Sequence, residues 1–327
     1  MPVPYFKVGT YESSGTTHTV GGSHYVPNGK RTNHMSIVIT GATGQLGRLV
    51  VADLLAAGVP SGDITAVARS EGKAEDLAAA GVRVRVADYD DPGSFKPVIG
   101  QGDRVLLISG TDIGRRAGQH AAVIDAAKEA GAAQLAYTGV FGGPAADFLL
   151  AADHRETEQL ILDSAVPYTF LRNGWYTDAP SFTADLPGIL ERGAIIGSTT
   201  EGARIATAPR TDYAEAAALV LREDGHLGKA YELSGDVAWA FDEFADEVSR
   251  QSGRRVVHRA VSPAEHKAAL VGAGLPEGFA EVLVDVDAAI SRGLLAGTPG
   301  DLSRLLGRPT TPLADSIAEA LAQAVEK

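Results

Sequence analysis

Short apolar runs alternate with amphipathic stretches between residues 36 and 173. The first run, Ile37–Thr40, precedes Leu46–Leu54, where the apolar residues recur at the spacing of one helix face. Gly58 and Pro60 end that predicted helix. The same pattern predicts further strands at Ile64–Arg69, Val82–Val86, Arg104–Ser109, Gln134–Thr138 and Tyr168–Arg172, with helices at Arg115–Gly131 and His154–Ala165.

Strands separated by helices predict an α/β fold, because each strand–helix–strand unit makes a right-handed crossover between parallel strands. We expect a Rossmann-type doubly wound parallel sheet in the strand order 3-2-1-4-5-6. After Asn173 helical spacing dominates, and Ser262–Glu265 reads as a capping box. The sequence therefore predicts a Rossmann-type domain over residues 35–173. A smaller, mostly helical C-terminal lobe over 174–327 follows, from which some segments can return to the sheet.

Residues 1–34 differ from the rest of the chain. They are rich in Gly, Ser, Thr, His and Tyr, show no period and lack the apolar core of a signal peptide. The only methionines are Met1 and Met35, and Met35 stands just before the first apolar run. We interpret Met35 as the natural start and residues 1–34 as a disordered leader, either a cloning extension or the product of a mis-assigned upstream start.

Charge and composition exclude several classes of function. The net charge of −12 argues against binding to nucleic acid or an anionic membrane, since both need clustered Lys and Arg. The chain has no cysteine, which removes disulfides, thiolate nucleophiles and cysteine-ligated metals and fits a cytoplasmic location. No apolar run reaches the length of about 18 residues that predicts a membrane span. We expect no metal site, and a homo-oligomer stays open.

The stretch ITGATGQLG joins the first predicted strand to the first helix. Gly41 permits a sharp turn, Gly44 lets a pyrophosphate approach the backbone, and Gly47 lets the helix lie close to the sheet. The helix amino end then offers N–H groups and a partial positive charge to phosphate. The spacing is GxxGxxG, a variant common among short-chain dehydrogenases. It predicts a dinucleotide site formed by Gly41, Thr43, Gly44, Gln45, Leu46 and Gly47.

The residue that closes the second strand distinguishes NAD from NADP. An acidic side chain there would bind the ribose 2′-hydroxyl of NAD, but the strand ends in Arg69, whose guanidinium can pair with a 2′-phosphate. We therefore predict NADP(H) as the cofactor. Asp88 and Tyr89, after the third strand, are placed to meet the adenine. Ser109 and Gly110, after the fourth strand, should line the path of the cofactor.

The proton-transferring pair of ordinary short-chain dehydrogenases is missing. Those enzymes use Tyr-x-x-x-Lys at the start of the helix between the fifth and sixth strands, where the Lys lowers the pKa of the Tyr. Here His154 stands in the place of the Lys and Leu150 in the place of the Tyr. A leucine cannot transfer a proton, so any reaction must proceed without this pair.

Six segments, in their order along the chain, carry a resemblance to a known family: MSIVITGATGQLG, QLAYTG, DHRETEQLILDS, VPYTFLRNGWYTD, GHLGKAYELSGD and RLLGRPTTPLADS. Over residues 35–327 the sequence resembles the NAD(P)H:quinone oxidoreductase 2 group of the NmrA-like atypical short-chain dehydrogenases. The triphenylmethane dye reductases share most of these segments. The run LLISGTDIGRRAGQH favours the quinone reductases.

The resemblance implies direct hydride transfer from NADPH to a quinone, which is reduced by two electrons to the hydroquinone. Such an acceptor needs little help from a general acid, because water can supply the second proton. Catalysis then depends on proximity and on polarising the quinone carbonyl. The resemblance also implies that the nicotinamide and acceptor pocket is lined by Tyr137, Thr138, Gly139, Asn173, Gly174, Trp175 and Tyr176.

Three residues are candidates for a catalytic role, and alternatives stay open for two of them. Asn173 ends the sixth strand, where ligands bind in parallel sheets, and its amide can donate to a quinone oxygen. His154 either acts in catalysis or only caps its helix, and Tyr137 is either a site residue or a core aromatic. Trp175 and Tyr176 either stack on a flat acceptor or pack between the two halves of the chain.

Three functions are compatible with these observations to different degrees. The first is an NADPH-dependent reductase of a quinone or a similar planar acceptor, with a triphenylmethane-dye reductase as its near alternative. The second is a non-catalytic NADP(H)-sensing regulator of the NmrA-like type, because sensors also lack the catalytic pair. A sugar-nucleotide epimerase or dehydratase is disfavoured, since its proton chemistry needs the missing Tyr.

Overall fold

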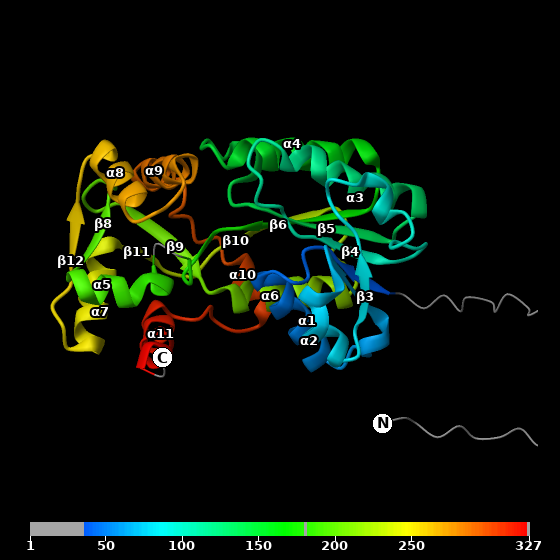
Figure 1. Ribbon diagram of the computed structural model, residues 1–327, viewed down its shortest axis with the longest axis horizontal. Helices are drawn as coiled ribbons and strands as arrows, with labels where there is room; N and C mark the ends of the chain where they lie inside the picture. Colours follow the sequence, from blue (N-terminus) through cyan, green and yellow to red (C-terminus); the bar gives the residue numbers. More distant parts are fainter. Residues whose placement is uncertain (1–35, 180–181, 326–327) are drawn as a thin grey trace, which may run out of the picture. The chain divides into compact units, whose positions relative to one another are not determined.

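The computed structural model describes residues 36–179 and 182–325. The expected leader over residues 1–34 therefore lies outside the described residues. The described chain contains a seven-stranded parallel sheet in the order β10-β6-β5-β4-β1-β2-β3 (Figure 1). Its strands are β1 (Ile37–Ile39), β2 (Ile64–Ala68), β3 (Arg83–Val86), β4 (Arg104–Leu107), β5 (Gln134–Val140), β6 (Tyr168–Asn173) and β10 (Lys229–Leu233). The α/β Rossmann-type fold and the order 3-2-1-4-5-6 are confirmed, with β10 added beside β6.

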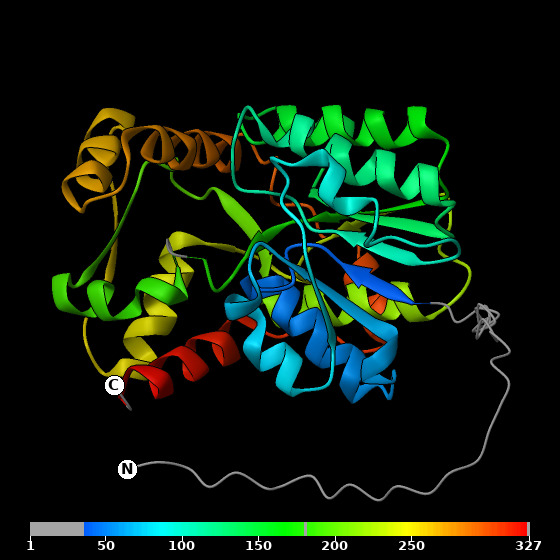
Figure 2. The same cartoon turned by 45° about the vertical axis from the view of Figure 1, so that its right-hand side comes forward.

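Helices cover both faces of this sheet, as Figures 1 and 2 show. One face carries α1 (Gln45–Ala56) and α6 (Arg210–Arg222), which pack against each other. The other face carries α3 (Arg116–Ala130) and α4 (Ala151–Ser164). Successive residues of a strand point to opposite faces. On β6, Leu171 accordingly joins the core under α1 and α6, and Phe170 joins the core under α3 and α4.

Helix α4 begins earlier than the sequence pattern predicts. The expected start is His154, but the helix starts at Ala151 after Leu150, which provides no side-chain cap. His154 therefore lies within the first turn, so the interpretation that it caps the helix is wrong. The helix ends at Ser164, where Ala165 takes a left-handed conformation with φ of 60°.

Strand β3 departs from the alternation in its sequence. Its valines alternate with Arg83 and Arg85, a pattern typical of one buried and one solvated face. In the structure Val84 is only partly buried and Val86 is half exposed. The reason is position, because β3 is the edge strand of the sheet and contacts only β2. The short helix α2 (Glu75–Ala79) covers only part of it.

The C-terminal lobe contains two small sheets and several helices. One sheet joins β7 (Trp175–Tyr176), β9 (Arg204–Ala208) and β11 (Ala238–Ala240), and the other joins β8 (Ala194–Gly197) to β12 (Val257–Ala260). The helices of the lobe are α5 (Leu186–Arg192), α7 (Phe241–Ser252), α8 (Pro263–Gly272), α9 (Glu277–Ser291) and α11 (Leu313–Val325). The capping box predicted at the start of α8 is confirmed, since Ser262 and Glu265 exchange hydrogen bonds.

Segments that follow Asn173 return to the nucleotide-binding half. Strand β10 extends the sheet, α6 packs on α1, and α10 (Asp301–Leu306) contacts both α6 and β10. Asp212 on α6 is fully buried and accepts hydrogen bonds from Arg308 and Thr311, which ties the C-terminal segment to this half. The division of the chain at residue 173 stays a prediction. The segments that return to the nucleotide-binding half come after residue 173 in the sequence. No helix among residues 36–179 and 182–325 is long and apolar enough to cross a membrane.

Candidate functional site

The glycine turn between β1 and α1 has the geometry that its sequence predicts. Gly41 has a φ of +61°, a left-handed conformation that other residues rarely adopt. A Cβ atom on residue 47 would lie 2.4 Å from the carbonyl oxygen of Gly41 and 2.7 Å from the Cα atom of Ala42. Gly47 therefore lets the first turn of α1 lie directly on the loop before it. Gly44 and Gln45 are exposed at the tip of the turn, with Thr43 partly exposed beside them.

The amino end of α1 is open to a ligand. Its N-cap is Gly44, so no side chain accepts a hydrogen bond from the first helical amides, and the first turn holds no acidic residue. Arg69 at the end of β2 is exposed and makes no hydrogen bond or ion pair to any described residue. Free amides, a helix dipole and an unpaired guanidinium are the donors that a pyrophosphate and a 2′-phosphate require.

The two residues expected near the adenine already have partners within the protein. The hydroxyl of Tyr89 donates to Thr40 Oγ1 at 2.8 Å and lies 3.0 Å from the carbonyl oxygen of Ile108, and its ring stacks on Phe95. Burial raises the pKa of Tyr89 to about 12. Asp88 accepts from the backbone N–H of Asp90 at 3.1 Å. Contact of either residue with adenine stays a prediction.

The ends of β4 and β5 are joined by a side chain from the predicted site. The backbone N–H of Ser109 donates to Thr138 Oγ1 at 2.9 Å, and Thr138 is buried. At Gly139 a Cβ atom would lie 3.2 Å from Glu158 Oε1 on α4, so a glycine keeps that carboxylate close to the strand. These contacts place Ser109, Thr138 and Gly139 at the carboxyl ends of neighbouring strands, where the sequence predicts the cofactor.

Tyr137 and His154 lie together on the α3–α4 face of the sheet. The Tyr137 hydroxyl is 2.7 Å from His154 Nδ1, and both side chains are buried. Burial raises the pKa of Tyr137 above its usual range and lowers the pKa of His154 well below its usual value, an effect that the guanidinium of Arg116 reinforces for the histidine. Both groups are therefore neutral near pH 7. This pair cannot supply the imidazolium or phenolate that a dehydrogenase uses in proton transfer.

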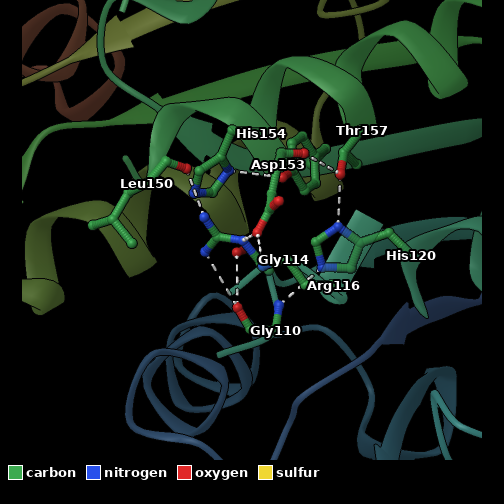
Figure 3. Close-up of polar contacts among 10 residues, drawn as sticks. Gly110, Gly114, Arg116, His120, Leu150, Asp153, His154 and Thr157 are labelled. Atoms are coloured by element: carbon green, nitrogen blue, oxygen red, sulfur yellow. Dashed lines mark hydrogen bonds and ion pairs between the residues drawn. The ribbon is translucent and has the colours of Figure 1, made fainter. Parts of the chain in front are cut away.

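A buried ion pair beside Tyr137 and His154 was missed by the sequence analysis. Arg116 Nε donates to Asp153 Oδ2 at 3.0 Å, and their side chains are only 6% and 12% exposed (Figure 3). Arg116 Nη2 also donates to the carbonyl oxygen of Leu150 at 2.6 Å, and Arg116 Nη1 lies 3.5 Å from that of Gly110. The backbone N–H of Gly114 donates to Asp153 Oδ2 at 2.7 Å. The loop after β4 and the start of α4 thus meet at one buried guanidinium.

The direction of each hydrogen bond around His120 follows from a backbone donor. The N–H of Gly110 donates to His120 Nε2 at 2.9 Å, so that nitrogen carries no proton (Figure 3). Nδ1 then carries the proton and donates to Thr157 Oγ1 at 2.9 Å, and this hydroxyl donates to the carbonyl oxygen of Asp153 at 2.8 Å. Burial, followed by the charge of Arg116, lowers the pKa of His120 to about 4. His120 is a neutral link between the loop and α4.

Asn173 lies away from the other two catalytic candidates, on the opposite face of the sheet. Asn173 lies two residues after Leu171 on β6, so its side chain points to the same face, toward α1 and α6. Tyr137 on β5 points toward α3 and α4. Asn173 Nδ2 donates to the Tyr176 hydroxyl at 3.3 Å, and the buried Oδ1 has no partner among the described residues. The structure brings Tyr137 and His154 together and leaves Asn173 apart from them.

The residues after Asn173 are packed against both halves of the chain. Gly174 donates its N–H to the carbonyl oxygen of Leu233 at 2.6 Å, and a Cβ there would lie 3.0 Å from the same oxygen. Tyr176 packs against the core of each half, and the guanidinium of Arg210 lies 4.4 Å from its ring centroid. Trp175 packs on the core of the lobe and is partly exposed. These contacts favour the packing role of Tyr176, whereas stacking on an acceptor stays a prediction for both.

Arg172, the neighbour of Asn173, holds a second charged cluster that the sequence analysis missed. It donates to Glu158 through Nε at 2.9 Å and Nη2 at 2.8 Å, and to Glu232 through Nη1 at 2.8 Å. Glu232 in turn accepts from the backbone N–H of Gly142 in the loop after β5. The cluster fixes the carboxyl ends of β5, β6 and β10 relative to one another.

A cavity of about 180 Å³ lies on the α1–α6 side and is lined by none of the predicted site residues. Arg210 and Asp178 lie in its wall and are paired with each other. Its remaining lining comes from Leu49, Thr183, Pro209, Thr211, Ser316, Glu319, Ala320 and Gln323. The glycine turn and the carboxyl ends of β4 to β6 remain the chemically defined site, because they carry the free donors and the network described above.

Taken together, the described residues fit a bound NADP(H). The tight glycine turn and the open helix end suit a pyrophosphate, Arg69 suits a 2′-phosphate, and the buried Oδ1 of Asn173 has no partner among the described residues. Within residues 36–179 and 182–325, no group of three or more His, Cys, Asp or Glu side chains is arranged to hold a metal ion.

Comparison with known proteins agrees with this geometry. Residues 41–224 match the family described as NAD(P)H-binding. The chain belongs to this family. Within it, the chain is 45% identical over 282 residues to quinone oxidoreductase 2 of Escherichia coli strain K12, an alignment that covers 86% of this chain and 97% of the relative. The predicted resemblance to the quinone oxidoreductase 2 group is thus confirmed.

Two solved structures are similar to this chain over nearly their full length. One is the NADPH-dependent quinone oxidoreductase of Escherichia coli in complex with NADPH, with 45% identity and a TM-score of 0.83, covering 87% of this chain and 99% of that one. The other is the triphenylmethane reductase of a Citrobacter species, with 41% identity and a TM-score of 0.83, covering 88% of this chain and 100% of that one.

Proposed function

We propose that this protein is an NADPH-dependent oxidoreductase that transfers hydride directly to a quinone and reduces it by two electrons to the hydroquinone. The observation that carries the proposal is the 45% identity, over 86% of the chain, to a quinone oxidoreductase. The geometry supports the same conclusion, because the glycine turn, the open end of α1 and Arg69 together fit NADP(H).

NADPH, when bound, supplies the hydride and its electron pair. The residues of this chain contribute binding and orientation. The amides of α1 and the guanidinium of Arg69 hold the phosphates, and the ends of β4 and β5 support the remainder of the cofactor. Tyr137 and His154 shape the site as a neutral, buried pair. Because both side chains are buried, the proposal takes the second proton of the hydroquinone from water.

Asn173 is the candidate for direct contact with the reacting groups. One of its amide atoms bonds the Tyr176 hydroxyl and the other is left unpaired. The two assignments differ by a half-turn of the amide, and the Tyr176 hydroxyl can serve either as donor or as acceptor. In both arrangements one polar atom remains to orient the nicotinamide or polarise the quinone carbonyl. Gly174, Trp175 and Tyr176 would form the adjoining wall for a planar acceptor.

We also propose that the protein is cytoplasmic. Its partners in this proposal are small molecules and not nucleic acid or a membrane. The net charge of −12 and the lack of cysteine support both statements. A homo-oligomer remains compatible with the sequence.

The proposal is tested by following NADPH absorbance with simple benzoquinones, naphthoquinones and a triphenylmethane dye, and by repeating the series with NADH. We expect rapid NADPH oxidation with quinones and slow oxidation with NADH. Dye decolourisation without quinone turnover would assign the protein to the dye reductases. Tight NADPH binding without turnover of any acceptor would make it a sensor of NADP(H).

The role of Asn173 is tested in the same assay. Asn173→Ala should lower kcat about tenfold, the effect of about 1.4 kcal/mol of lost transition-state stabilisation. Gln159→Ala removes an exposed amide from α4 and serves as the matched control. Full turnover by Asn173→Ala would remove Asn173 from the proposed site.

A further inference from the structure

The loop between β4 and α3 is held from two sides through its own backbone. At Gly110 the N–H is bound by His120 Nε2 at 2.9 Å, and the carbonyl oxygen lies 3.5 Å from Arg116 Nη1. At Gly114 the N–H is bound by Asp153 Oδ2 at 2.7 Å. Both ends of a glycine-containing loop are thereby fixed, although glycine itself imposes little conformational preference.

The ion pair in this network is costly by itself. Burial of a guanidinium and a carboxylate removes both from water, and well-packed apolar side chains in their place are often as stable or more stable. Arg116 and Asp153 are 6% and 12% exposed in their side chains, so little water offsets this cost. Folding stability therefore does not explain the pair. Its distinctive feature is that every remaining hydrogen bond goes to backbone, in the loop or at the start of α4.

The network also connects the loop to the helix that carries His154. Arg116 binds the carbonyl oxygen of Leu150, the N-cap of α4, at 2.6 Å. His120 reaches the same helix through Thr157, whose hydroxyl binds the carbonyl oxygen of Asp153 (Figure 3). The loop after β4 and the first turn of α4 therefore keep one relative position.

We propose that Arg116, Asp153 and His120 are positioning residues that hold the loop of residues 109–114 in the conformation that receives NADPH. The inference rests on the proposed function in one respect, namely that Ser109 and Gly110 line the path of the cofactor. If the loop is fixed before binding, nearly all molecules hold it in the conformation that can bind NADPH. The apparent dissociation constant rises in inverse proportion to the competent fraction.

The test replaces the ion pair by apolar side chains of similar size, Arg116→Met together with Asp153→Leu. We expect the dissociation constant for NADPH, measured by fluorescence without any acceptor, to rise about tenfold, as when about one molecule in ten holds the loop correctly. At saturating NADPH, kcat should change less than about twofold, because the bound cofactor selects the correct loop. A packing defect would instead lower kcat or the melting temperature and leave the dissociation constant unchanged.

Amide hydrogen exchange gives a readout that does not depend on catalysis. In the free double variant, the peptide covering residues 109–116 should exchange at least about tenfold faster than in the wild type, since the acceptor of the Gly114 N–H is gone. NADPH should restore its protection. Unchanged exchange together with an unchanged dissociation constant would overturn the proposal.

Two further variants complete the test. Arg104 at the amino end of β4 also binds backbone, donating to the carbonyl oxygens of Leu221 at 3.1 Å and Glu223 at 2.7 Å, far from the carboxyl end of the strand. Arg104→Met should therefore leave the dissociation constant unchanged. Asp153→Asn keeps the shape of the side chain and one acceptor oxygen, and should raise the constant about threefold. If the double variant does not fold, Asp153→Asn alone decides, and an unchanged constant there overturns the proposal.

The outcome is separable from that of the proposed function. If the wild type binds NADPH but reduces no quinone, the proposed reaction fails while the binding and exchange measurements still test the loop. If the wild type reduces quinones and the variants bind NADPH normally, the positioning role fails alone.

Discussion

The two faces of the central sheet treat polar groups in opposite ways. On the α1–α6 face, the first amides of α1 have no side-chain cap, and Asn173 retains an unpaired amide oxygen. On the α3–α4 face, the polar atoms of Arg116, Asp153 and His120 that face the loop are bound by backbone or by one another. In the proposed function a ligand completes the first face, whereas the polar groups of the second face are paired before any ligand binds.

This difference separates binding from positioning. The unpaired amides at the exposed tip of the glycine turn cost little because water solvates them, and they become strong contacts when an anion replaces the water. The unpaired Oδ1 of Asn173 is buried and lacks this solvation. A buried polar network is stable only if every member is satisfied, and it then allows one arrangement. Variants on the first face should therefore change affinity for the cofactor directly. Variants on the α3–α4 face should change folding stability or the fraction of molecules that hold the loop of residues 109–114 in its binding conformation.

The strongest test of the first face is Gly47→Ala. Because the added Cβ would lie 2.4 Å from a backbone oxygen, the turn must move, and we expect a cost of about 4 kcal/mol shared between folding and NADPH binding. Chemical unfolding and fluorescence titration measure the two parts. Gly278→Ala in α9, where an added Cβ meets nothing within 4 Å, is the matched control. Normal stability and affinity in Gly47→Ala would contradict the assignment of this turn.

The second face should show a dependence of stability on pH that is due to His120. Its pKa is lowered from 6.5 to about 4 in the folded protein, so between these values the unfolded chain binds the proton and the folded chain does not. Its contribution to stability is present above pH 6.5 and is lost as the pH falls, by about 3 kcal/mol at pH 4. When the free energy of unfolding is measured between pH 7 and pH 4, it should fall less steeply with falling pH in His120→Gln than in the wild type. An unaltered slope would show that His120 is not held neutral.

A smaller effect at the nucleotide site is expected from Arg69→Glu. Loss of a charge-assisted contact with the 2′-phosphate costs about 2 kcal/mol, or roughly 30-fold in affinity for NADPH, with little change for NADH. The ratio of kcat/KM values for the two cofactors measures the effect. Arg254→Glu, an exposed arginine in the lobe, controls for net charge. If Arg69→Glu and Arg254→Glu both keep the wild-type preference for NADPH over NADH, Arg69 does not select the cofactor.

The smallest effect is expected from Tyr137→Phe. The change removes the hydrogen bond to His154 Nδ1 and should lower the free energy of unfolding by about 1 kcal/mol. Since Tyr137 is buried and neutral, kcat should stay within about twofold. Tyr168→Phe, on the neighbouring strand, gives the cost of a hydroxyl that makes no hydrogen bond to a described residue. A large loss of kcat in Tyr137→Phe alone would restore a proton-transfer role.

The sheet and its glycine turn could be predicted from the sequence because their signals are local. The apolar runs mark the strands, and Gly41 and Gly47 occupy positions where backbone geometry excludes a side chain. The true start of α4 was not predictable in this way. Ala151 and Ala152 are good helix formers without a capping residue before them, so the pattern gives no start signal ahead of Asp153.

The candidate site could be predicted only where it depends on strand ends. Arg69, Ser109 and Asn173 follow from their places in the strand order. The pairing of Arg116 with Asp153 joins residues 37 positions apart on different helices, and neither residue belongs to a local motif. Alternation along the strands separates Asn173 from Tyr137. Tyr137 pairs with Phe170, three residues before Asn173, so the side chains of Tyr137 and Asn173 point to opposite faces of the sheet. This difference can be worked out only when the register of β5 and β6 is known.

The late return of the chain to the sheet has a consequence for synthesis on the ribosome. Val50 and Leu54 of α1 are buried in the core shared with α6, which begins only at Arg210, and β10 is complete only at Leu233. At about 5–20 residues per second, the emerging α1 waits on the order of 10 s for its packing partner. During that interval its apolar face is exposed on the nascent chain. The nucleotide-binding half therefore completes its folding only after part of the lobe has been translated, and the two halves mature together.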